Sequence, residues 1–330
     1  MTKNNKNVIC DKEDNLYISK WGFMNKSLFI ESITDSFSWH KCSKSGALIP
    51  LLKHIYESNH IKFGDVSPIP AGVSEIFQVN NTIVKLFPPP EAKIGYDDKF
   101  YQTELSAMNF CKSAGVLTPD IICHGIVNDC VYSFPYILMV HIDGIEARKI
   151  VPNYSNAEKT DFALKLKEIT SRIYIPTNID IPRYNDSEKI NSNSWNSMPE
   201  AFREDRKHYL ANSKFPDPVF QHGDLWDGNI FIDKQGCLVL IDFAESLIAP
   251  SYYDMGPMIL NGGYDSIRLE AYFGDYRNDV FYDTFTTAWL LNWFGATFIE
   301  WSAKDMGIDF KSLTSVNTLK NMIVKMFNNL

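Results

Sequence analysis

QHGDLWDGNIFIDKQGCLVLIDF, residues 221–243, decides the fold of this chain. Two short apolar, β-branched runs, 230–233 and 237–241, lie on either side of Lys234-Gln235-Gly236, a turn with glycine at its last position. Apolar runs separated by a short turn of this composition predict a β-hairpin. The stretch therefore contains a loop, a strand, a tight turn and a second strand that ends in an acidic residue.

The register of this hairpin brings three polar side chains together. If the residues next to the turn face each other, Asn229 faces Ile241, so Asn229 and Asp242 emerge at the same open end. Asp224 lies upstream, on the loop that leads into this end. In phosphoryl transfer, one carboxylate accepts the proton of the attacking hydroxyl, while a carboxylate and an amide hold magnesium. Asp224 is the candidate base, and Asn229 and Asp242 are the candidate metal ligands.

The loop itself carries a known spacing. His222-x-Asp224-Leu225-x-x-x-Asn229 matches the catalytic-loop signature H-x-D-L-x-x-x-N of kinases. The alternative is a surface loop whose Asp and Asn only stabilise turns, which is a common use of these residues. We favour the catalytic interpretation because the hairpin places a second acid where the metal needs it.

Composition and charge narrow the class of protein. The chain has 330 residues, of which 45% are hydrophobic and 14% aromatic, which suits a globular protein of two lobes. The net charge of −8 argues against nucleic acid or an anionic membrane as the main partner. It is compatible with a cationic ligand, and we expect a monomer or a small homo-oligomer.

The cysteines and the hydrophobic segments favour a cytoplasmic location. The six cysteines show neither a C-x-x-C pair nor metal-ligand spacing, so we expect reduced thiols in the core. Residues 1–10 lack the apolar core of a signal peptide. The longest apolar stretch, 287–301, is too short to span a bilayer and predicts one buried helix.

The first lobe, residues 1–143, is expected to hold the nucleotide. Residues 1–60 predict a helical extension with a helix at 47–56. Strand and turn patterns follow from residue 65 and predict a five-stranded antiparallel sheet that includes 82–87, 121–127 and 132–142. The turn within residues 70–77 carries Gly72 and Ser74, and its amides could contact phosphate, although most such turns are only turns.

Lys85 is the residue of interest in the strand 82–87. Its face also carries Ile83 and Phe87, so we expect an enclosed ammonium, which needs a partner. The following helix, 97–114, places Glu104 at the edge of its apolar stripe. A lysine–glutamate pair of this kind positions the phosphate-binding lysine of kinases. The alternative is an edge-strand lysine that extends to water.

The second lobe, residues 144–330, begins after the apolar run that ends at Ile142. By position alone, Val140 and Ile142 would offer backbone groups to the base of a nucleotide. Residues 155–174 predict a helix with a capping box, and 200–210 predict another. The Asn-, Ser- and Pro-rich residues 175–199 predict an irregular insertion. The fold class is therefore α+β and bilobal, like a protein kinase, with a mainly helical second lobe around the catalytic hairpin.

The second lobe also suggests the class of acceptor. No A-P-E element follows Asp242, which disfavours a protein kinase. Residues 245–283 carry seven acidic side chains against two arginines, an arrangement that would attract a polycation. A solvated helical face is the alternative for any one of them. The candidate substrate-binding residues are Asp227, Glu245, Asp254 and Glu270.

Residues 222–233, HGDLWDGNIFID, followed by Ile241-Asp242-Phe243, resemble the aminoglycoside phosphotransferase family, which has a kinase-like fold. The chain is most similar to the hygromycin-B kinase type, on the Gly72 and Ser74 turn, the strand 84–87 and the approach 136–139 to the hinge. The similarity covers about residues 65–260.

The resemblance implies ATP or GTP with Mg²⁺, Asp224 as base, and Asn229 and Asp242 as metal ligands. It also implies that Lys85 binds the α- and β-phosphates with Glu104 as its partner. His222 would organise the loop, and the acceptor would be a small-molecule hydroxyl held by acidic residues. A phosphate loop with a single glycine departs from the kinase pattern, which puts nucleotide selectivity in doubt.

Two other functions remain open on the sequence. A metabolic kinase acting on choline, a sugar or an amino alcohol would share all of these motifs. A catalytically inactive nucleotide-binding protein is disfavoured because Asp224, Asn229, Asp242 and Lys85 are all present.

Overall fold

The computed structural model describes residues 9–11, 16–18, 24–94, 99–184, 193–260 and 264–330. The chain forms two compact units, Met1–Tyr101 with Pro119–Ile142 and Gln102–Thr118 with Asp143–Leu330. The chain passes from the first to the second unit after Ile142. The segment Gln102–Thr118 belongs to the second unit, although the sequence placed it in the first lobe.

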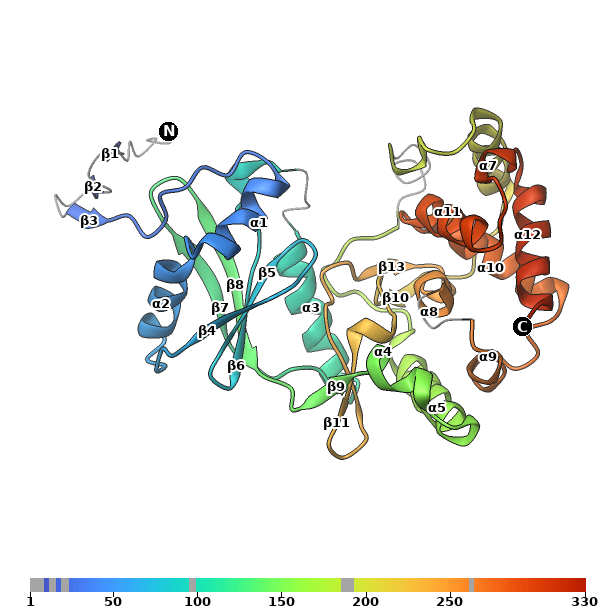
Figure 1. The fold of residues 1–330 in the computed structure, drawn as a ribbon, viewed down its shortest axis with the longest axis horizontal. Coiled ribbons are helices and arrows are strands. Elements are labelled where there is room, and N and C mark those ends of the chain that lie inside the picture. The colour runs from blue at the N-terminus through green and yellow to red at the C-terminus, as the bar shows by residue number, and fades with distance from the viewer. Residues whose placement is uncertain (1–8, 12–15, 19–23, 95–98, 185–192, 261–263) are drawn as a thin grey trace. The chain divides into compact units, whose positions relative to one another are not determined.

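The first unit contains the predicted antiparallel sheet of five strands (Figure 1). In spatial order the strands are β4 (Val66–Ile69), β5 (Glu75–Val79), β6 (Thr82–Leu86), β8 (Ser133–Val140) and β7 (Ile121–Asn128). The first of these lies at the edge, where Pro68 costs the sheet no ladder hydrogen bond. Asn80 turns the chain between β5 and β6 with φ of 55°, a left-handed conformation that asparagine tolerates.

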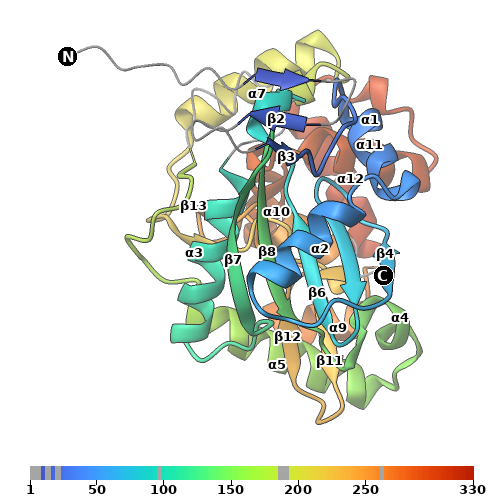
Figure 2. The same ribbon diagram turned by 90° about the vertical axis from the view of Figure 1, so that its left-hand side faces the viewer.

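Two helices, α1 (Ser36–Ser45) and α2 (Ile49–Ser58), pack against one face of this sheet (Figure 2). Trp39 and Leu52 from the helices share one core with Val84 and Leu86 of β6. The prediction of a helix near 47–56 is confirmed. The prediction of a helical extension over residues 1–60 is wrong in part, because three short strands, β1 (Ile9–Asp11), β2 (Leu16–Ile18) and β3 (Met24–Lys26), pair antiparallel before α1.

The second unit contains the catalytic hairpin with the predicted register. β11 (Ile230–Asp233) pairs with β12 (Leu238–Leu240), and Phe231 faces Val239. β9 (Gly144–Glu146) adds a third strand on the other side of β11. A separate pair, β10 (Val219–Gln221) and β13 (Leu247–Ala249), lies immediately before and after the hairpin segment in the chain.

Helices form the rest of the second unit. They are α3 (Phe100–Ser113, which begins at the end of the first unit), α4 (Ala147–Ile150), α5 (Asn156–Ile173), α7 (Glu200–Asn212), α8 (Met255–Leu260), α9 (Ser266–Phe273), α10 (Asp279–Leu291), α11 (Gly295–Asp305) and α12 (Val316–Asn328). The predicted capping box at the start of α5 is present, with Ser155 and Glu158 bonded to each other's backbone N–H. The predicted insertion at 175–199 contains the short helix Asn193–Trp195, and its residues 185–192 lie outside the described part.

The prediction of one buried helix over 287–301 is wrong. The helix breaks between α10 and α11, where the Asn292 side chain accepts the Phe294 N–H at 2.9 Å. A Cβ on Gly295 would lie 1.9 Å from the Trp289 carbonyl oxygen, so this turn requires glycine. The polar capping residue and the glycine override the apolar pattern, and the turn leaves Trp293 and Phe294 partly exposed.

Two findings bear on the expected location. None of the described helices combines the length and apolar character needed to cross a membrane. Four cysteines, Cys42, Cys111, Cys123 and Cys237, have free thiols. Cys130 is disulfide-bonded, so the expectation that all six cysteines are reduced is wrong.

Candidate active site

The open end of the hairpin brings the predicted base and one predicted metal ligand into contact. The Ile241 N–H donates to the Asn229 carbonyl at 3.0 Å, which confirms the predicted pairing and places Asp242 next to Asn229 along the ladder. The Asn229 side-chain amide donates to the Asp224 carbonyl at 2.8 Å and to its carboxylate at 2.9 Å. The motif residues Asp224 and Asn229 therefore form one hydrogen-bonded unit.

Asp242 leaves the hairpin in an uncommon backbone conformation. Its φ of 62° lies in the left-handed region, which costs a non-glycine residue of order 1 kcal/mol. The neighbouring residues hold it there, because Phe243 is fully buried and its ring lies 4.6 Å from the His222 ring. His222 also hydrogen-bonds the Ile241 carbonyl through Nε2 at 3.0 Å. His222 thus organises the loop, the role that the sequence resemblance implied for it.

The carboxylates at this end influence each other's ionisation. The pKa of Asp224 is raised to about 8, mainly by burial and then by the nearby Glu245 and Asp242 carboxylates, while the Asn229 hydrogen bond acts in the opposite direction. A pKa close to the working pH suits a general base, which must exchange a proton easily. The same crowding of negative charge favours a cation at this place.

The oxygen atoms at this end fit the needs of a magnesium ion that also binds phosphate. Both hydrogen bonds that Asn229 gives to Asp224 use its amide nitrogen, which leaves the amide oxygen for a cation. With the Asp242 carboxylate this makes a pair of hard oxygen ligands, and Mg²⁺ typically takes one or two such protein groups and completes its shell with phosphate and water. The described residues contain no group of three or more His, Cys, Asp or Glu that could hold a metal ion.

Asp254 anchors the start of the catalytic loop. It is 1% exposed, and its carboxylate accepts the His222 N–H at 2.7 Å, the Gly223 N–H at 2.9 Å and the Tyr174 hydroxyl at 2.7 Å. Burial nevertheless raises the pKa of Asp254 to about 6, against the effect of these donors. The candidate role in substrate binding is withdrawn for Asp254, because the carboxylate is buried and already bonded.

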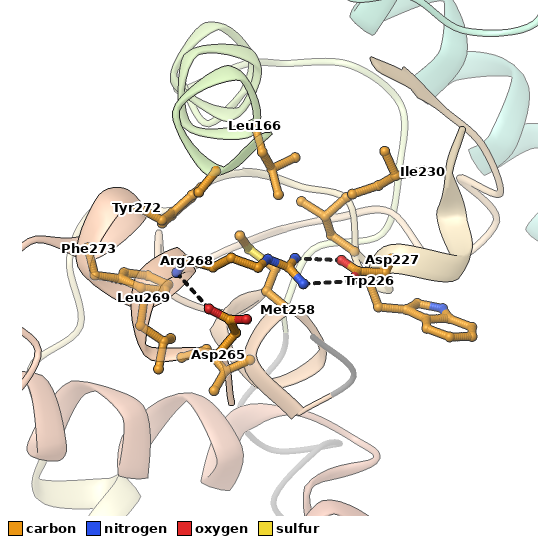
Figure 3. A pocket seen from close by; sticks show the side chains of 13 residues that line it. Leu166, Trp226, Asp227, Ile230, Met258, Asp265, Arg268, Leu269, Tyr272 and Phe273 are labelled. Carbon is orange, nitrogen blue, oxygen red and sulfur yellow. Dashed lines mark hydrogen bonds and ion pairs between the residues drawn. The ribbon is translucent and has the colours of Figure 1, made fainter. Parts of the chain in front are cut away.

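Asp227 is also buried, and an arginine side chain occupies its carboxylate. It is 3% exposed and lies in the short helix Asp227–Asn229, where its carboxylate accepts two hydrogen bonds from Arg268 of α9, both at 2.7 Å (Figure 3). The pair borders a small pocket lined by residues of α5, α8, α9 and the catalytic loop. We therefore withdraw Asp227 as a substrate-binding candidate as well.

Glu245 keeps its place among the substrate-binding candidates. It lies next to the catalytic loop, because a Cβ on Gly223 would stand 2.0 Å from the Glu245 carbonyl oxygen. Its carboxylate accepts the indole N–H of Trp293 at 2.8 Å, and Trp293 is 36% exposed. Glu270 is exposed on α9, but it is about 200° around the helix from Arg268 and so does not face the loop.

The predicted nucleotide residues of the first unit lie on β6 and on the turn before β5. Lys85 is 4% exposed, and its ammonium lies 5.3 Å from the centre of the Phe87 ring, so the expected enclosure is confirmed. Glu104 of α3 is 2% exposed. Because Lys85 lies in the first unit and Glu104 in the second, their ion pair stays a prediction. Ser74 is buried, and Gly72 has open space where a Cβ would lie.

The hinge contacts of Val140 and Ile142 stay predictions, but one hydrogen bond limits what Val140 can offer. The Val140 N–H donates to the Asp120 carbonyl at 2.9 Å, so it cannot also donate to a nucleotide base. Ile142 lies beyond the end of β8 and remains a candidate.

The sequence reasoning missed Arg268, Tyr174 and Trp293. A signal existed for Arg268, one of two arginines in the acidic segment 245–283, since an isolated cation among acids is a natural partner for a buried carboxylate. Trp293 carried a weaker signal, because an asparagine and a glycine bracket Trp293 and Phe294 inside an apolar run and mark a turn. Nothing local distinguishes Tyr174 from other tyrosines.

Comparison with known proteins agrees with this geometry. The model of the phosphotransferase enzyme family matches residues 65–293, and the chain belongs to this family. A search of curated protein sequences finds no significant match.

Solved structures share the kinase-like fold at low sequence identity. The GDP complex of aminoglycoside 2'-phosphotransferase-IIIa is similar with a TM-score of 0.59 and 16% identity, over 84% of this chain and 99% of that one. Aminoglycoside phosphotransferase APH(4)-Ia in a ternary complex with ADP and hygromycin B has a TM-score of 0.55 and 13% identity, over 83% and 97%. The ADP-bound APH(2'')-Ib has a TM-score of 0.54 and 14% identity, over 84% and 98%.

Proposed function

We propose that this phosphotransferase moves the γ-phosphoryl group of ATP or GTP to a hydroxyl of a small cationic, aminoglycoside-like compound. The observation that carries the proposal is the contact between Asp224 and Asn229 at the mouth of the hairpin, with a base whose pKa is raised to about 8. A carboxylate held by an amide next to a second acid is what hydroxyl activation beside a metal-bound phosphate requires.

In the proposed reaction, an acceptor hydroxyl lies against the Asp224 carboxylate and gives up its proton to it. The acceptor oxygen forms a bond to the γ-phosphorus as the bond to the leaving nucleoside diphosphate breaks. Asn229 and Asp242 would hold Mg²⁺, which supplies positive charge to the phosphate oxygens. Lys85 would bind the α- and β-phosphates, with Glu104 as its partner, and the turn of Gly72 and Ser74 and the backbone of Ile142 would contact the nucleotide.

The side of the loop that carries Glu245 supports a cationic acceptor. Its carboxylate lies close enough to Asp224 to raise the pKa of that base, and the indole of Trp293 is fixed on it by a hydrogen bond. An acid next to a partly exposed indole ring suits an ammonium-bearing molecule, because both the carboxylate and the face of the ring attract positive charge. A thermostable mutant of aminoglycoside phosphotransferase APH(4)-Ia, solved in a ternary complex with ADP and hygromycin B, has a similar fold.

A metabolic kinase for choline, a sugar or an amino alcohol is the alternative. The purified chain with Mg²⁺ and either ATP or GTP should be assayed for diphosphate release with hygromycin B, kanamycin, choline, ethanolamine and neutral hexoses. We expect release with an aminoglycoside and growth of an expressing strain on that drug. Release with choline or a hexose alone would replace the aminoglycoside proposal by the metabolic one, and no release with any acceptor would contradict both.

A further inference from the structure

Asp227 occupies a particular place in the catalytic loop. The sequence between the proposed base and the first proposed metal ligand is Leu225-Trp226-Asp227-Gly228, so Asp227 is the one charged residue of this connection. The Arg268 guanidinium meets the Asp227 carboxylate with two parallel hydrogen bonds of 2.7 Å each (Figure 3). The side chains of the pair are 4% and 12% exposed, so water screens the interaction little.

The rest of the connection is packed so that a movement of Asp227 would also displace Asp224 and Asn229. Leu225 is fully buried, and the Asn229 N–H donates to the Trp226 carbonyl at 2.8 Å. A Cβ on Gly228 would lie 2.4 Å from the Trp226 ring, so this ring lies directly over the glycine. The Asn229 amide then reaches back to Asp224. The hydrogen bond between Asn229 and Asp224 thus closes the loop, and Asp227 connects the loop to Arg268 of α9.

Arg268 is itself fixed by contacts that do not involve the loop. Its guanidinium lies 4.9 Å from the Phe162 ring of α5. The α9 helix that carries it begins at Asp265, whose carboxylate caps the helix and pairs with Lys159 of α5 at 2.7 Å. Near the other end of α9, the Tyr272 hydroxyl hydrogen-bonds Thr170 of α5 at 2.6 Å. Helices α5 and α9 therefore form a platform, the α5–α9 platform, that does not depend on the ion pair between Arg268 and Asp227.

We propose that Arg268 is a positioning residue for phosphoryl transfer: by fixing the Asp227 carboxylate to the α5–α9 platform, it sets the relative placement of Asp224 and Asn229. The inference rests on the proposed function for its kinetic consequence. A guanidinium fork fixes both the position and the orientation of a carboxylate, whereas a lysine ammonium supplies charge without the second bond. Displacement of a catalytic group by about 1 Å can cost about 100-fold in rate.

The pocket beside the pair gives a direct way to test this role. Its apolar wall, which includes Leu166, Met258 and Leu269, leads to the Arg268–Asp227 pair (Figure 3). Truncation of Arg268 would join the volume of its side chain to this pocket. A small alkylguanidinium ion could then enter and meet the Asp227 carboxylate with the same two hydrogen bonds. A structural void elsewhere in the unit would not respond to such an ion.

The main variant is Arg268→Lys, measured by steady-state kinetics, thermal melting and amide hydrogen exchange of residues 221–232. We expect kcat to fall about 10- to 100-fold with the nucleotide KM nearly unchanged, as for other residues that orient a reacting group. Exchange should become faster in the loop and stay slow in α5 and α9. Arg268→Ala should lose more activity and recover part of it with ethylguanidinium. If Arg268→Lys does not fold, Asp227→Asn/Arg268→Gln removes both charges and takes its place.

Lys320→Met is the matched control, since it breaks another ion pair of the second unit, to Asp283 of α10 at 2.6 Å, which belongs neither to the loop nor to the α5–α9 platform. It should leave kcat and loop exchange unchanged. Equal losses in Lys320→Met and Arg268→Lys, or unchanged kcat and loop exchange in Arg268→Lys, would overturn the proposal. If the wild type releases no diphosphate with any acceptor, the proposed function fails, and exchange alone decides: faster exchange confined to the loop supports positioning by Arg268, and unchanged exchange refutes it.

Discussion

Two regions of the catalytic loop use carboxylates for different purposes. The back contains Asp227 and Asp254, and the mouth contains Asp224, Asp242 and Glu245. At the back, Asp227 and Asp254 are buried and each is bonded to several donors: the Arg268 fork for one, two backbone N–H groups and a tyrosine hydroxyl for the other. At the mouth, burial and the acidic side chains near it raise the pKa of Asp224 to about 8.

The difference separates carboxylates that hold structure from carboxylates available for chemistry. A buried carboxylate that already accepts hydrogen bonds from the protein holds the chain in place and does not bind a ligand, because a ligand could reach it only by breaking these hydrogen bonds. Carboxylates that repel one another store an unfavourable interaction that a cation relieves. By this criterion the metal and the acceptor belong at the mouth, and the back sets where the mouth residues lie.

The largest effect should follow from Asp224→Asn, which removes the base and keeps its shape. We expect kcat to fall about 10²- to 10⁴-fold, the usual contribution of a general base, while magnesium–nucleotide binding stays within a few-fold. The melting temperature should not fall, because the change removes a charge from a crowded place. Coupled-assay kinetics and nucleotide titration measure both quantities. Near-normal turnover would show that another group takes the proton.

Asp254→Asn tests the back of the loop through the dependence of stability on pH. The folded pKa, about 6, lies above the ordinary value of 3.8, so the contribution of this carboxyl is fully present below about pH 4 and is lost as the pH rises through 6. A shift of two pKa units corresponds to about 3 kcal/mol. We expect the stability advantage of the wild type over the variant to narrow by up to that amount between pH 4 and pH 7.

Denaturant unfolding at several pH values between 4 and 7.5 gives this difference directly. Asp227→Asn is the comparison at the same side of the loop, because its carboxylate is also buried but pairs with an arginine side chain. A difference between wild type and Asp254→Asn that stays constant with pH would mean that the three donors keep Asp254 ionised at every pH tested.

How far the sequence predicted the fold depended on whether the determining interactions were local. The hairpin, its register and the five-stranded sheet follow from strand periodicity and turn residues, which act over a few positions. The break between α10 and α11 was missed because apolar residues continue across it. Its cause, a cap by Asn292 and the close approach of Gly295 to Trp289, is clear only once the helices are packed.

The site shows the same limit. A motif of eight residues contained Asp224 and Asn229, and the hairpin register added Asp242, so spacing alone placed these groups together. Asp227, three residues from Asp224, looked equally available in the sequence. Its partner, Arg268, is 41 residues away on another helix, and no local pattern relates the two. The choice between a structural and a functional carboxylate was therefore a tertiary question.

Glu245→Gln should have a smaller effect and tests whether repulsion between carboxylates distinguishes the mouth of the loop from its back. Glu245 is the carboxylate that raises the pKa of Asp224 most, so its neutralisation should lower that pKa in the metal-free protein. Carbon-13 NMR titration of the aspartate carboxyls, with Asp224→Asn to assign the signal, measures the change. Glu270→Gln, exposed on α9, is the control and should leave the titration unchanged. An unchanged pKa in Glu245→Gln would show that burial and the other carboxylates determine it without Glu245.

The smallest effect concerns the indole that lies against Glu245. An exposed cation–π contact contributes about 0.5–1 kcal/mol, so Trp293→Leu should raise the KM of a cationic acceptor about two- to fivefold with kcat nearly unchanged. Trp293→Phe keeps a ring but cannot donate to Glu245, and thus separates the ring from the hydrogen bond. Trp301→Leu changes a more exposed tryptophan of α11 and is the control. Equal KM values in wild type and Trp293→Leu would show that Glu245 binds the cation without the indole. If the KM rises in Trp293→Leu but not in Trp293→Phe, the aromatic ring is a second cation-binding group.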